Sequence, residues 1–300
     1  MFYKLRNNFR KWKFNRQCAG ILKTPPIALK KDGMVLVSMV CHSDVIMYLL
    51  SAKSFLHRIG MGRVVIINDG TLTEEDQAVL KRHISPLRIV PITDIPTKPC
   101  PPGGTWERLL HIADVSAGDY VIQLDSDTLT LQDIPEVVQA VQVNRPFLLG
   151  TASGLRVEPI ANAVALMKDS ASNHVQAKAE KSFDRLTGFP GLNYCRACSG
   201  FAGFGKGLAS RDTLTDFSTQ METILGRKWH EWGSEQVSSN FLLSNCAGAS
   251  VLPYPDYSEF KPDKDLSGVR FLHFIGTYRW HNGAYAKMGR ELIRHLLKPK

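Results

Sequence analysis

Apolar and polar positions alternate along the first half of the chain in the manner of an α/β protein. Short runs rich in Val, Ile and Leu predict buried strands, at residues 34–40, 64–67, 87–90 and 120–124. Segments with helical periodicity separate them, at residues 43–59, from Thr73 onward and at 106–115. The order of strands and helices predicts an α/β fold with a mostly parallel, doubly wound sheet flanked by helices.

The second half of the chain alternates less clearly. Residues 131–143 predict a turn and a short helix, and residues 146–150 predict a strand. Residues 161–183 are rich in Ala, Lys and Gln and predict a helix, and glycine-rich loops are expected over residues 188–207. This half is expected to carry the substrate-binding part of the fold.

Two carboxylates leave the end of the fourth predicted strand together, in the sequence Asp125-Ser126-Asp127. Open α/β sheets place their ligands outside the carboxyl ends of the strands. A carboxylate pair in that position can hold a hard divalent cation and, through it, a diphosphate. Asp69, which follows the second predicted strand, is a candidate nucleotide-binding residue. A second Asp-x-Asp, Asp263 to Asp265, lies in a predicted exposed loop and is interpreted as chance.

Charge separates a basic N-terminal arm, residues 1–31, from a neutral body, residues 32–300. The arm holds nine Lys and Arg residues and no acid, whereas 28 basic and 28 acidic residues balance in the body. The body is expected to form one continuous domain with two halves, residues 32–150 and 151–300. No nucleic-acid partner is expected, because the basic character is confined to the arm.

The arm also carries bulky apolar residues in one helical stripe, at Phe2, Leu5, Phe9 and Trp12. Basic residues with such a stripe suit an anionic membrane surface. A helix packed on the body and a loose solvated tail are the alternatives. No apolar run is long enough to span a bilayer, and the start of the sequence lacks the apolar segment of a signal peptide. The expected location is therefore the cytoplasm, with peripheral contact at the inner face of the membrane as an open alternative.

Four segments, in order, resemble the retaining glycosyltransferases of the glycogenin and lipopolysaccharide-galactosyltransferase kind, which share the GT-A fold. They are Thr105-Trp106-Glu107-Arg108-Leu109, Tyr120 to Asp127, Glu235-Gln236-x-x-x-Asn240 and His273-x-x-Gly276-x-x-Arg279-Trp280. The resemblance covers residues 105–280, and it implies a GT-A-like fold. It also implies a metal-dependent transfer of a sugar, with retention, from a nucleotide diphosphate sugar to a saccharide or glycolipid acceptor. The expected donor is linked to UDP.

The resemblance gives a role to each matching residue. Asp125, Asp127 and His273 would hold the metal, which is manganese by resemblance; magnesium suits the same ligand types. Gly276 and Arg279 would bind the diphosphate, since glycine permits a close backbone approach and arginine can bind phosphate oxygens bidentately. Gln236, near the anomeric carbon, and Glu235, which would bind donor or acceptor hydroxyls, are the candidate catalytic residues. Arg108 would reach the diphosphate or donor sugar, and Asp125 would share the metal or hold the ribose. Residues 32–150 would then be the nucleotide-sugar half of the domain, and residues 151–300 the acceptor half.

Several positions depart from the pattern of the family. Arg279 stands where members carry Lys, and the usual Pro before Trp280 is missing. Val40-Cys41-His42-Ser43-Asp44 replaces the usual base-binding residues, and the nearest text to the usual sugar-contacting Asn-Ala-Gly is Cys198-Ser199-Gly200. These departures keep a non-catalytic nucleotide-sugar or glycan-binding protein open as the alternative function.

Four of the candidate residues can also be explained by a purely structural role. His273 lies in an apolar run and suits a core histidine, and Arg279 suits a surface arginine stacked on Trp280. Arg108 can form an ion pair with Asp114 or Asp119. Glu235 can sit in the first turn of a helix that Ser234 caps.

Overall fold

The protein is described by a computed structural model over residues 2–298, and these divide into two compact units that are interleaved along the chain. The first unit runs up to Pro91 and resumes over Leu124–Ile134 and from Asp256 onward. The second unit comprises Ile92–Gln123 and Pro135–Pro255. The expected halves of residues 32–300, divided at residue 150, stay a prediction.

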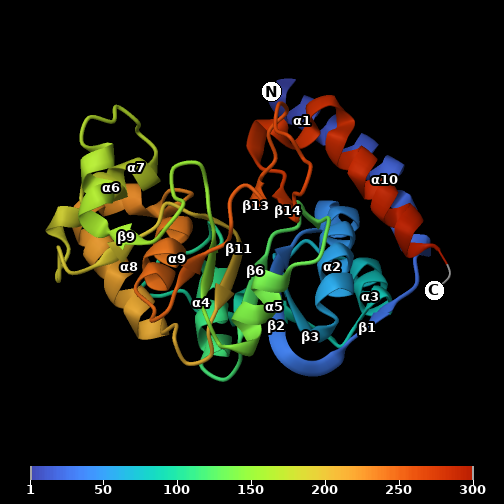
Figure 1. Ribbon diagram of the computed structural model, residues 1–300, viewed down its shortest axis with the longest axis horizontal. Coiled ribbons are helices and arrows are strands. Elements are labelled where there is room, and N and C mark those ends of the chain that lie inside the picture. The colour runs from blue at the N-terminus through green and yellow to red at the C-terminus, as the bar shows by residue number, and fades with distance from the viewer. Residues whose placement is uncertain (1, 299–300) are drawn as a thin grey trace. The chain divides into compact units, whose positions relative to one another are not determined.

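The first unit combines strands with helices in alternation (Figure 1). Its helices are α1 (Phe2–Cys18), α2 (Val45–Ile59), α3 (Glu74–His83) and α10 (Ala284–Leu296). Its strands are β1 (Ile27–Ala28), β2 (Lys30–Val40), β3 (Met61–Asn68), β4 (Ile84–Ser85), β5 (Leu87–Pro91), β7 (Thr128–Thr130), β13 (Tyr257–Glu259) and β14 (Phe271–His273). Short 3₁₀ helices cover Ala19–Lys23, His42–Asp44 and Gly276–Gly283.

Strands β2, β3 and β5 lie side by side in that order, and both pairings are parallel. Residues 34–40 of β2 and 64–67 of β3 are mostly buried, which explains why they read as continuous apolar runs, whereas β5 buries only Val90. Helix α3 starts at the predicted place because Thr73 and Asp76 form a reciprocal capping box. A separate small sheet, in the order β13-β14-β7, brings residues near 130 beside residues near 272.

The second unit carries the remaining helices and strands of the described residues. Its helices are α4 (Trp106–Ser116), α5 (Pro135–Gln142), α6 (Ile160–Met167), α7 (Val175–Lys181), α8 (Arg211–Leu225) and α9 (Ser234–Ser244), with 3₁₀ turns at Ile92–Asp94, Phe183–Arg185 and Gly226–His230. Its strands are β8 (Phe147–Leu149), β9 (Glu158–Pro159), β10 (Asn193–Tyr194), β11 (Cys198–Phe204) and β12 (Ser250–Val251), and β6 (Val121–Leu124) ends where the chain re-enters the first unit.

Strands of the second unit follow the order β12-β8-β11-β6. The pairing of β12 with β8 is parallel, and that of β11 with β8 is antiparallel. Together with the parallel strands of the first unit, this confirms an α/β fold with a mostly parallel sheet. Strand β6 and helix α4 have almost the predicted bounds, so the segment that leads into Asp125 is built as the sequence indicates.

The expectation of glycine-rich loops over residues 188–207 is wrong for β11, a fully buried strand. Packing selects Gly203 in this strand, because a Cβ there would come 2.3 Å from the ring of Phe147 and 2.4 Å from the hydroxyl of Tyr120. Glycine inside a strand often marks such a close approach. Because glycine has a low strand propensity, the sequence pattern did not predict a strand here.

The single helix predicted over residues 161–183 is two helices, α6 and α7. The stretch between them contains Asp, Ser and Asn, whose side chains compete for backbone hydrogen bonds and favour turns. Helix α7 then restarts behind His174, whose Nδ1 accepts a hydrogen bond from the backbone N–H of Gln176 at 3.2 Å.

The arm is not a loose tail, because α1 packs against the first unit. Phe14 and Cys18 on its inner face are buried, and Figure 1 shows α1 running alongside α10. The side chains of Phe2 and Leu5, two members of the predicted apolar stripe, lie outside the described residues. Over residues 2–298, no helix is both long and apolar enough to cross a membrane.

Candidate functional site

The chain turns sharply between β6 and β7, and hydrogen bonds to its backbone hold this turn in place. The Ser51 hydroxyl, from α2, donates to the backbone oxygen of Asp125 at 2.9 Å, and the Thr128 hydroxyl reaches the same oxygen at 3.1 Å. The backbone oxygen of Asp127 accepts from the N–H of Phe274 at 2.8 Å. The two carboxylates therefore stand on a backbone that is fixed from both sides.

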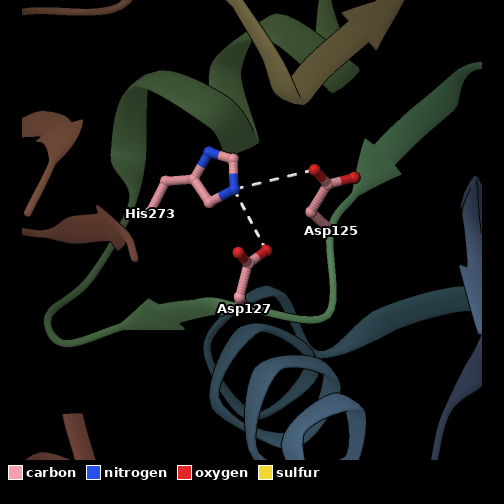
Figure 2. Close-up of side chains that lie close together, drawn as sticks. All are labelled: Asp125, Asp127 and His273. Atoms are coloured by element: carbon pink, nitrogen blue, oxygen red, sulfur yellow. Dashed lines mark hydrogen bonds and ion pairs between the residues drawn. The ribbon is translucent and has the colours of Figure 1, made fainter. Parts of the chain in front are cut away.

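Strand pairing brings the predicted histidine to these carboxylates. Strand β14 runs antiparallel to β7, with His273 directly opposite Thr128, the residue after Asp127. His273 Nε2 lies 3.1 Å from Oδ1 of Asp127 and 3.6 Å from Oδ2 of Asp125 (Figure 2). We call Asp125, Asp127 and His273 the acid cluster; their three ligand atoms all lie within 4.8 Å of one another.

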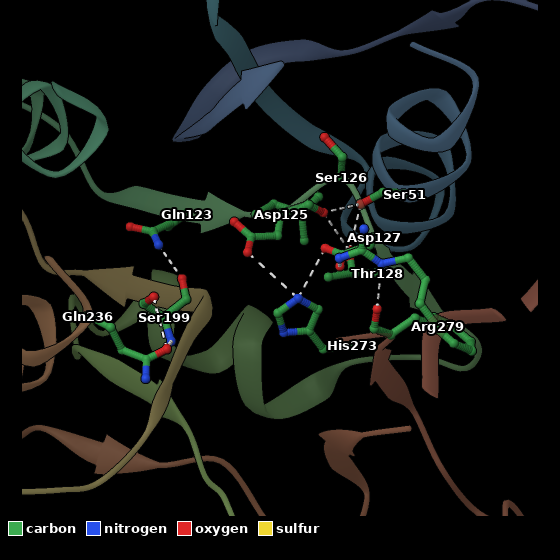
Figure 3. A network of polar contacts seen from close by, with 12 residues as sticks. Ser51, Gln123, Asp125, Ser126, Asp127, Thr128, Ser199, Gln236, His273 and Arg279 are labelled. Carbon is green, nitrogen blue, oxygen red and sulfur yellow. Dashed lines mark hydrogen bonds and ion pairs between the residues drawn. The ribbon is translucent and has the colours of Figure 1, made fainter. Parts of the chain in front are cut away.

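Arg279 binds the other side of Asp127. Its Nη2 forms an ion pair with Oδ2 of Asp127, and its Nε donates to the backbone oxygen of Phe274 at 2.9 Å (Figure 3). The guanidinium carbon also lies 5.9 Å from the ring centre of Trp280, so the predicted stacking and a contact with the site occur together. Burial raises the pKa of Asp127, but His273 and Arg279 outweigh burial and lower that pKa to about 2.

The acid cluster has the chemistry of a site for a hard divalent cation. It offers two carboxylate oxygens and one imidazole nitrogen, a set that Mn²⁺ and Mg²⁺ accept. Asp127 is buried whereas the side chain of Asp125 is 26% exposed, so the cluster is buried on one side and open to solvent on the other. Arg279 holds Oδ2 of Asp127 and leaves Oδ1 directed at the cluster.

The second unit holds another polar cluster around the first turn of α9. Glu235 Oε1 lies 3.4 Å from Nη2 of Arg108, and both side chains are buried. The Ser199 hydroxyl, from β11, lies 3.3 Å from Oε1 of Gln236 and 3.5 Å from Oε2 of Glu235 (Figure 3 shows the Ser199–Gln236 contact). We call Arg108, Ser199, Glu235 and Gln236 the Glu235 network.

Structure corrects two of the alternatives considered for this region. Ser234 does not cap α9, because Gly233 occupies the cap position and the Ser234 hydroxyl accepts from the indole N–H of Trp106 at 2.9 Å. Arg108 faces Glu235, whereas Asp114 binds Arg211. Both contacts join residues about a hundred positions apart, beyond the reach of a local sequence pattern.

Sequence reasoning did not assign Ser199 or Gln176 to the site, although each contacts Gln236. The Gln236 amide nitrogen donates to Oε1 of Gln176 at 3.2 Å. The sequence gives a weak indication of Ser199, because Cys198-Ser199-Gly200 is the segment most similar to the sugar-contacting Asn-Ala-Gly of the family. Gln176 lies in a segment with no resemblance, so its position is visible only in the fold.

Two further candidates lie at ends of elements in the first unit. Asp69 follows β3, and its Oδ1 accepts from the backbone N–H and the hydroxyl of Thr71 at 3.0 and 2.7 Å. Gly276 opens the 3₁₀ segment after β14 with φ of +51°, a conformation that favours glycine. Their predicted contacts with a nucleotide stay predictions.

Comparisons with known proteins show the fold. No family model and no curated protein matches the sequence. An active-site mutant of LgtC matches 89% of this chain and 98% of its own, with a TM-score of 0.53 and 13% identity. Galactosyltransferase LgtC in complex with donor and acceptor sugar analogs covers the same shares, with a TM-score of 0.50 and 12% identity. The bifunctional glycosyltransferase WbbM matches 89% of this chain but only 53% of its own, with a TM-score of 0.50 and 12% identity.

The chain thus has the GT-A fold of glycosyltransferases, and the expected resemblance in fold is confirmed. The likeness extends over nearly the full length of LgtC, so it involves the whole architecture and not one βαβ unit. Asp125 and Asp127 lie on this fold directly after β6, where the Asp-x-Asp pair was expected, and β14 supplies His273.

Proposed function

We propose that the protein is a metal-dependent glycosyltransferase that moves a sugar from a nucleotide diphosphate sugar to a saccharide or lipid-linked acceptor. The observation that supports this most is the convergence of Asp125, Asp127 and His273 on a GT-A fold. The acid cluster combines residues 146 positions apart, and neither a lone Asp-x-Asp nor a core histidine requires that convergence.

The proposed roles follow from charge. Asp125, Asp127 and His273 would hold the cation, which would supply positive charge to a departing diphosphate. Arg279 fixes Asp127 through Oδ2, and its remaining N–H groups can donate to a phosphate oxygen. Gly276 has no side chain and would let the backbone come close to the diphosphate. Asp69 is assigned to the nucleotide by its position after β3, and Arg108 to the donor by resemblance.

Gln236 and Glu235 are proposed to act at the sugar. Gln236 would place its amide oxygen near the anomeric carbon, where positive charge develops in the transition state. Glu235 would bind hydroxyls of donor or acceptor. Ser199 supports this proposal, because its hydroxyl contacts both side chains and can fix their rotamers. Retention of anomeric configuration and a UDP-linked donor are the finer expectations.

Calorimetric titration of UDP and GDP, each with and without manganese, tests the proposal. We expect one nucleotide to bind only when the metal is present, and Asp127→Asn to abolish that binding. Asp263→Asn is a matched control, since it removes the same charge from the exposed second Asp-x-Asp. Metal-independent binding, or equal losses in the two variants, would exclude the acid cluster as the metal site.

Two assays address the finer expectations. Proton NMR of the early product reports its anomeric configuration, and an inverted product would contradict retention. Hydrolysis of the donor in the absence of acceptor distinguishes an enzyme from a binding protein on the same fold, because a transferase that activates the donor also transfers the sugar slowly to water. Nucleotide binding without any hydrolysis or transfer would favour the non-catalytic alternative.

A further inference from the structure

Helix α1 has two unlike faces. The inner face packs on the first unit: Phe14 and Cys18 are buried, and Phe14 stacks obliquely on Tyr285 with ring centres 4.5 Å apart. Lys11 on the same side donates to the Ser43 hydroxyl at 2.7 Å and forms an ion pair with Asp44. This face fixes the orientation of the helix, and so determines which residues point away from the protein.

The opposite face exposes aromatic rings among cations. The Phe9 and Trp12 side chains are 62% and 55% exposed, and their rings stack with centres 5.8 Å apart. The guanidinium carbon of Arg16 lies 5.6 Å from the ring centre of Trp12. The outer face of α1 consists of these three residues and three further exposed cations, Arg6, Arg10 and Lys13.

Charge and shape together favour one partner for this face. Exposed single aromatics are common, but a stacked pair ringed by four cations with no acid in the helix is a concentrated pattern. A helix lying in the headgroup plane satisfies both features, because aromatic rings enter the interface while long cationic side chains reach lipid phosphates. A protein partner would need an acidic surface with an apolar strip at its centre, a more particular requirement.

We propose that the outer face of α1 docks the protein on an anionic lipid bilayer. The helix would lie along the surface, with Phe9 and Trp12 in the headgroup region and Arg6, Arg10, Lys13 and Arg16 on anionic lipids. Binding of this kind is independent of the acid cluster, so it does not rest on the proposed glycosyl transfer.

The same helix contacts the candidate site through its inner face. The indole N–H of Trp280 donates to Oδ1 of Asn7 at 2.8 Å, and the neighbouring Arg279 binds Asp127. Docking would therefore hold the acid cluster close to the bilayer, where a lipid-linked acceptor is concentrated.

Sedimentation with lipid vesicles tests the proposal on the full chain. The vesicles are phosphatidylcholine alone, or phosphatidylcholine mixed with phosphatidylglycerol, at about 0.1 M and about 1 M salt. We expect binding only to the mixed vesicles and loss of that binding at high salt. The variant Arg6→Gln, Arg10→Gln, Lys13→Gln, Arg16→Gln should bind roughly a hundredfold more weakly.

Control variants remove the same kinds of side chain, four cations or two apolar residues, from surfaces outside α1. The variant Lys81→Gln, Arg82→Gln, Lys181→Gln, Lys206→Gln removes four exposed cations outside α1 and should retain binding within about threefold, because it leaves the outer face of α1 intact. Phe9→Ser with Trp12→Ser should lose about tenfold, whereas Leu155→Ser with Leu166→Ser, which removes two exposed apolar residues of the second unit, should not.

Three outcomes would overturn the proposal. They are equal binding to neutral and anionic vesicles, equal losses in the α1 and control variants, and no vesicle binding combined with tight binding to duplex DNA or RNA. Circular dichroism and thermal unfolding of each variant check that α1 remains folded. Nucleotide titration, measured separately, keeps failure here distinct from failure of the proposed function.

Discussion

The acid cluster and the Glu235 network both contain a carboxylate beside an arginine, yet they are built for different purposes. In the acid cluster, Asp125 is partly open to solvent and three ligand atoms converge within 4.8 Å. In the Glu235 network, the side chains of Arg108 and Glu235 are 6% and 4% exposed and face each other. The first arrangement is suited to accept a cation from solution. The second holds its carboxylate against a buried guanidinium.

This difference implies different responses to substitution. Removing an acid from the acid cluster should weaken ligand binding more than folding, since Arg279 can turn to solvent. Removing the acid from the Glu235 network should weaken folding, because a buried guanidinium loses the charge that faces it. Matched substitutions in the two places therefore separate a site that recruits a cation from a buried ion pair that also stabilises the fold.

The largest effect is expected at Asp127. Asp127→Asn keeps the shape of the side chain but removes its charge, so metal-dependent nucleotide affinity should fall roughly a thousandfold, or about 4 kcal/mol. Thermal unfolding should show a smaller loss, of about 2 kcal/mol at neutral pH, because the interactions that lower the pKa of Asp127 to about 2 also stabilise the folded protein. A large loss of stability with unchanged nucleotide affinity would show that Asp127 is a structural residue, and that the acid cluster is not the binding site.

Glu235→Ala should show the opposite pattern, with a loss of about 3 kcal/mol in unfolding free energy measured in urea. Glu158→Ala is the control, because its ion pair with Arg156 is largely solvated and should contribute little to stability. Nucleotide affinity measured with Glu235→Gln, which retains the hydrogen-bonding shape, then reports a role in binding. Similar stability losses in the two alanine variants would contradict a closed network.

Acid sensitivity of the first unit should come in part from His83, away from the acid cluster. Burial, with help from Lys53 and Arg82, lowers the pKa of His83 from 6.5 to about 4. Because the unfolded chain binds this proton first, stability is full above about pH 6.5 and falls as the pH drops toward 4, by about 2–3 kcal/mol. Urea unfolding at several pH values should show a flatter dependence in His83→Asn. An unchanged dependence would assign the acid sensitivity to other groups.

The smallest expected effect is at Asn7. Asn7→Ala removes the acceptor for the Trp280 indole and should cost about 1 kcal/mol of stability. Nucleotide affinity should also fall about threefold, because Arg279 is then held less firmly. Asn8→Ala, at the exposed neighbouring position, is the control. Equal behaviour of the two variants would show that α1 does not position the site.

Much of the first unit and of β6 could be predicted because local patterns determine it. The buried parallel strands read as apolar runs, and the start of α3 follows from Thr73 and its capping partner. Asp125 and Asp127 could be located for the same reason, since they directly follow such a strand. The resemblance then added His273, whose spacing to Gly276 and Arg279 a core histidine does not need.

The missed features depend on contacts between distant residues. Strand β11 was hidden because the ring of Phe147, not local propensity, selects Gly203. The partner of Arg108 lies 127 positions along the chain, and that of Asp127 lies 152 positions away at Arg279. Sequence spacing alone carries no information about such pairs, so the local alternatives at Asp114 and Asp119 looked equally good.

The pairing of β7 with β14 has a consequence for how the chain is made. On the ribosome, Asp125 and Asp127 emerge long before His273, which follows 146 residues later. Until β14 is synthesised, β7 presents an open strand edge, and two like charges stand without their imidazole and guanidinium. The acid cluster is therefore a late product of synthesis, and a nascent chain that stalls before Phe271 would carry an exposed strand edge that can pair with other chains.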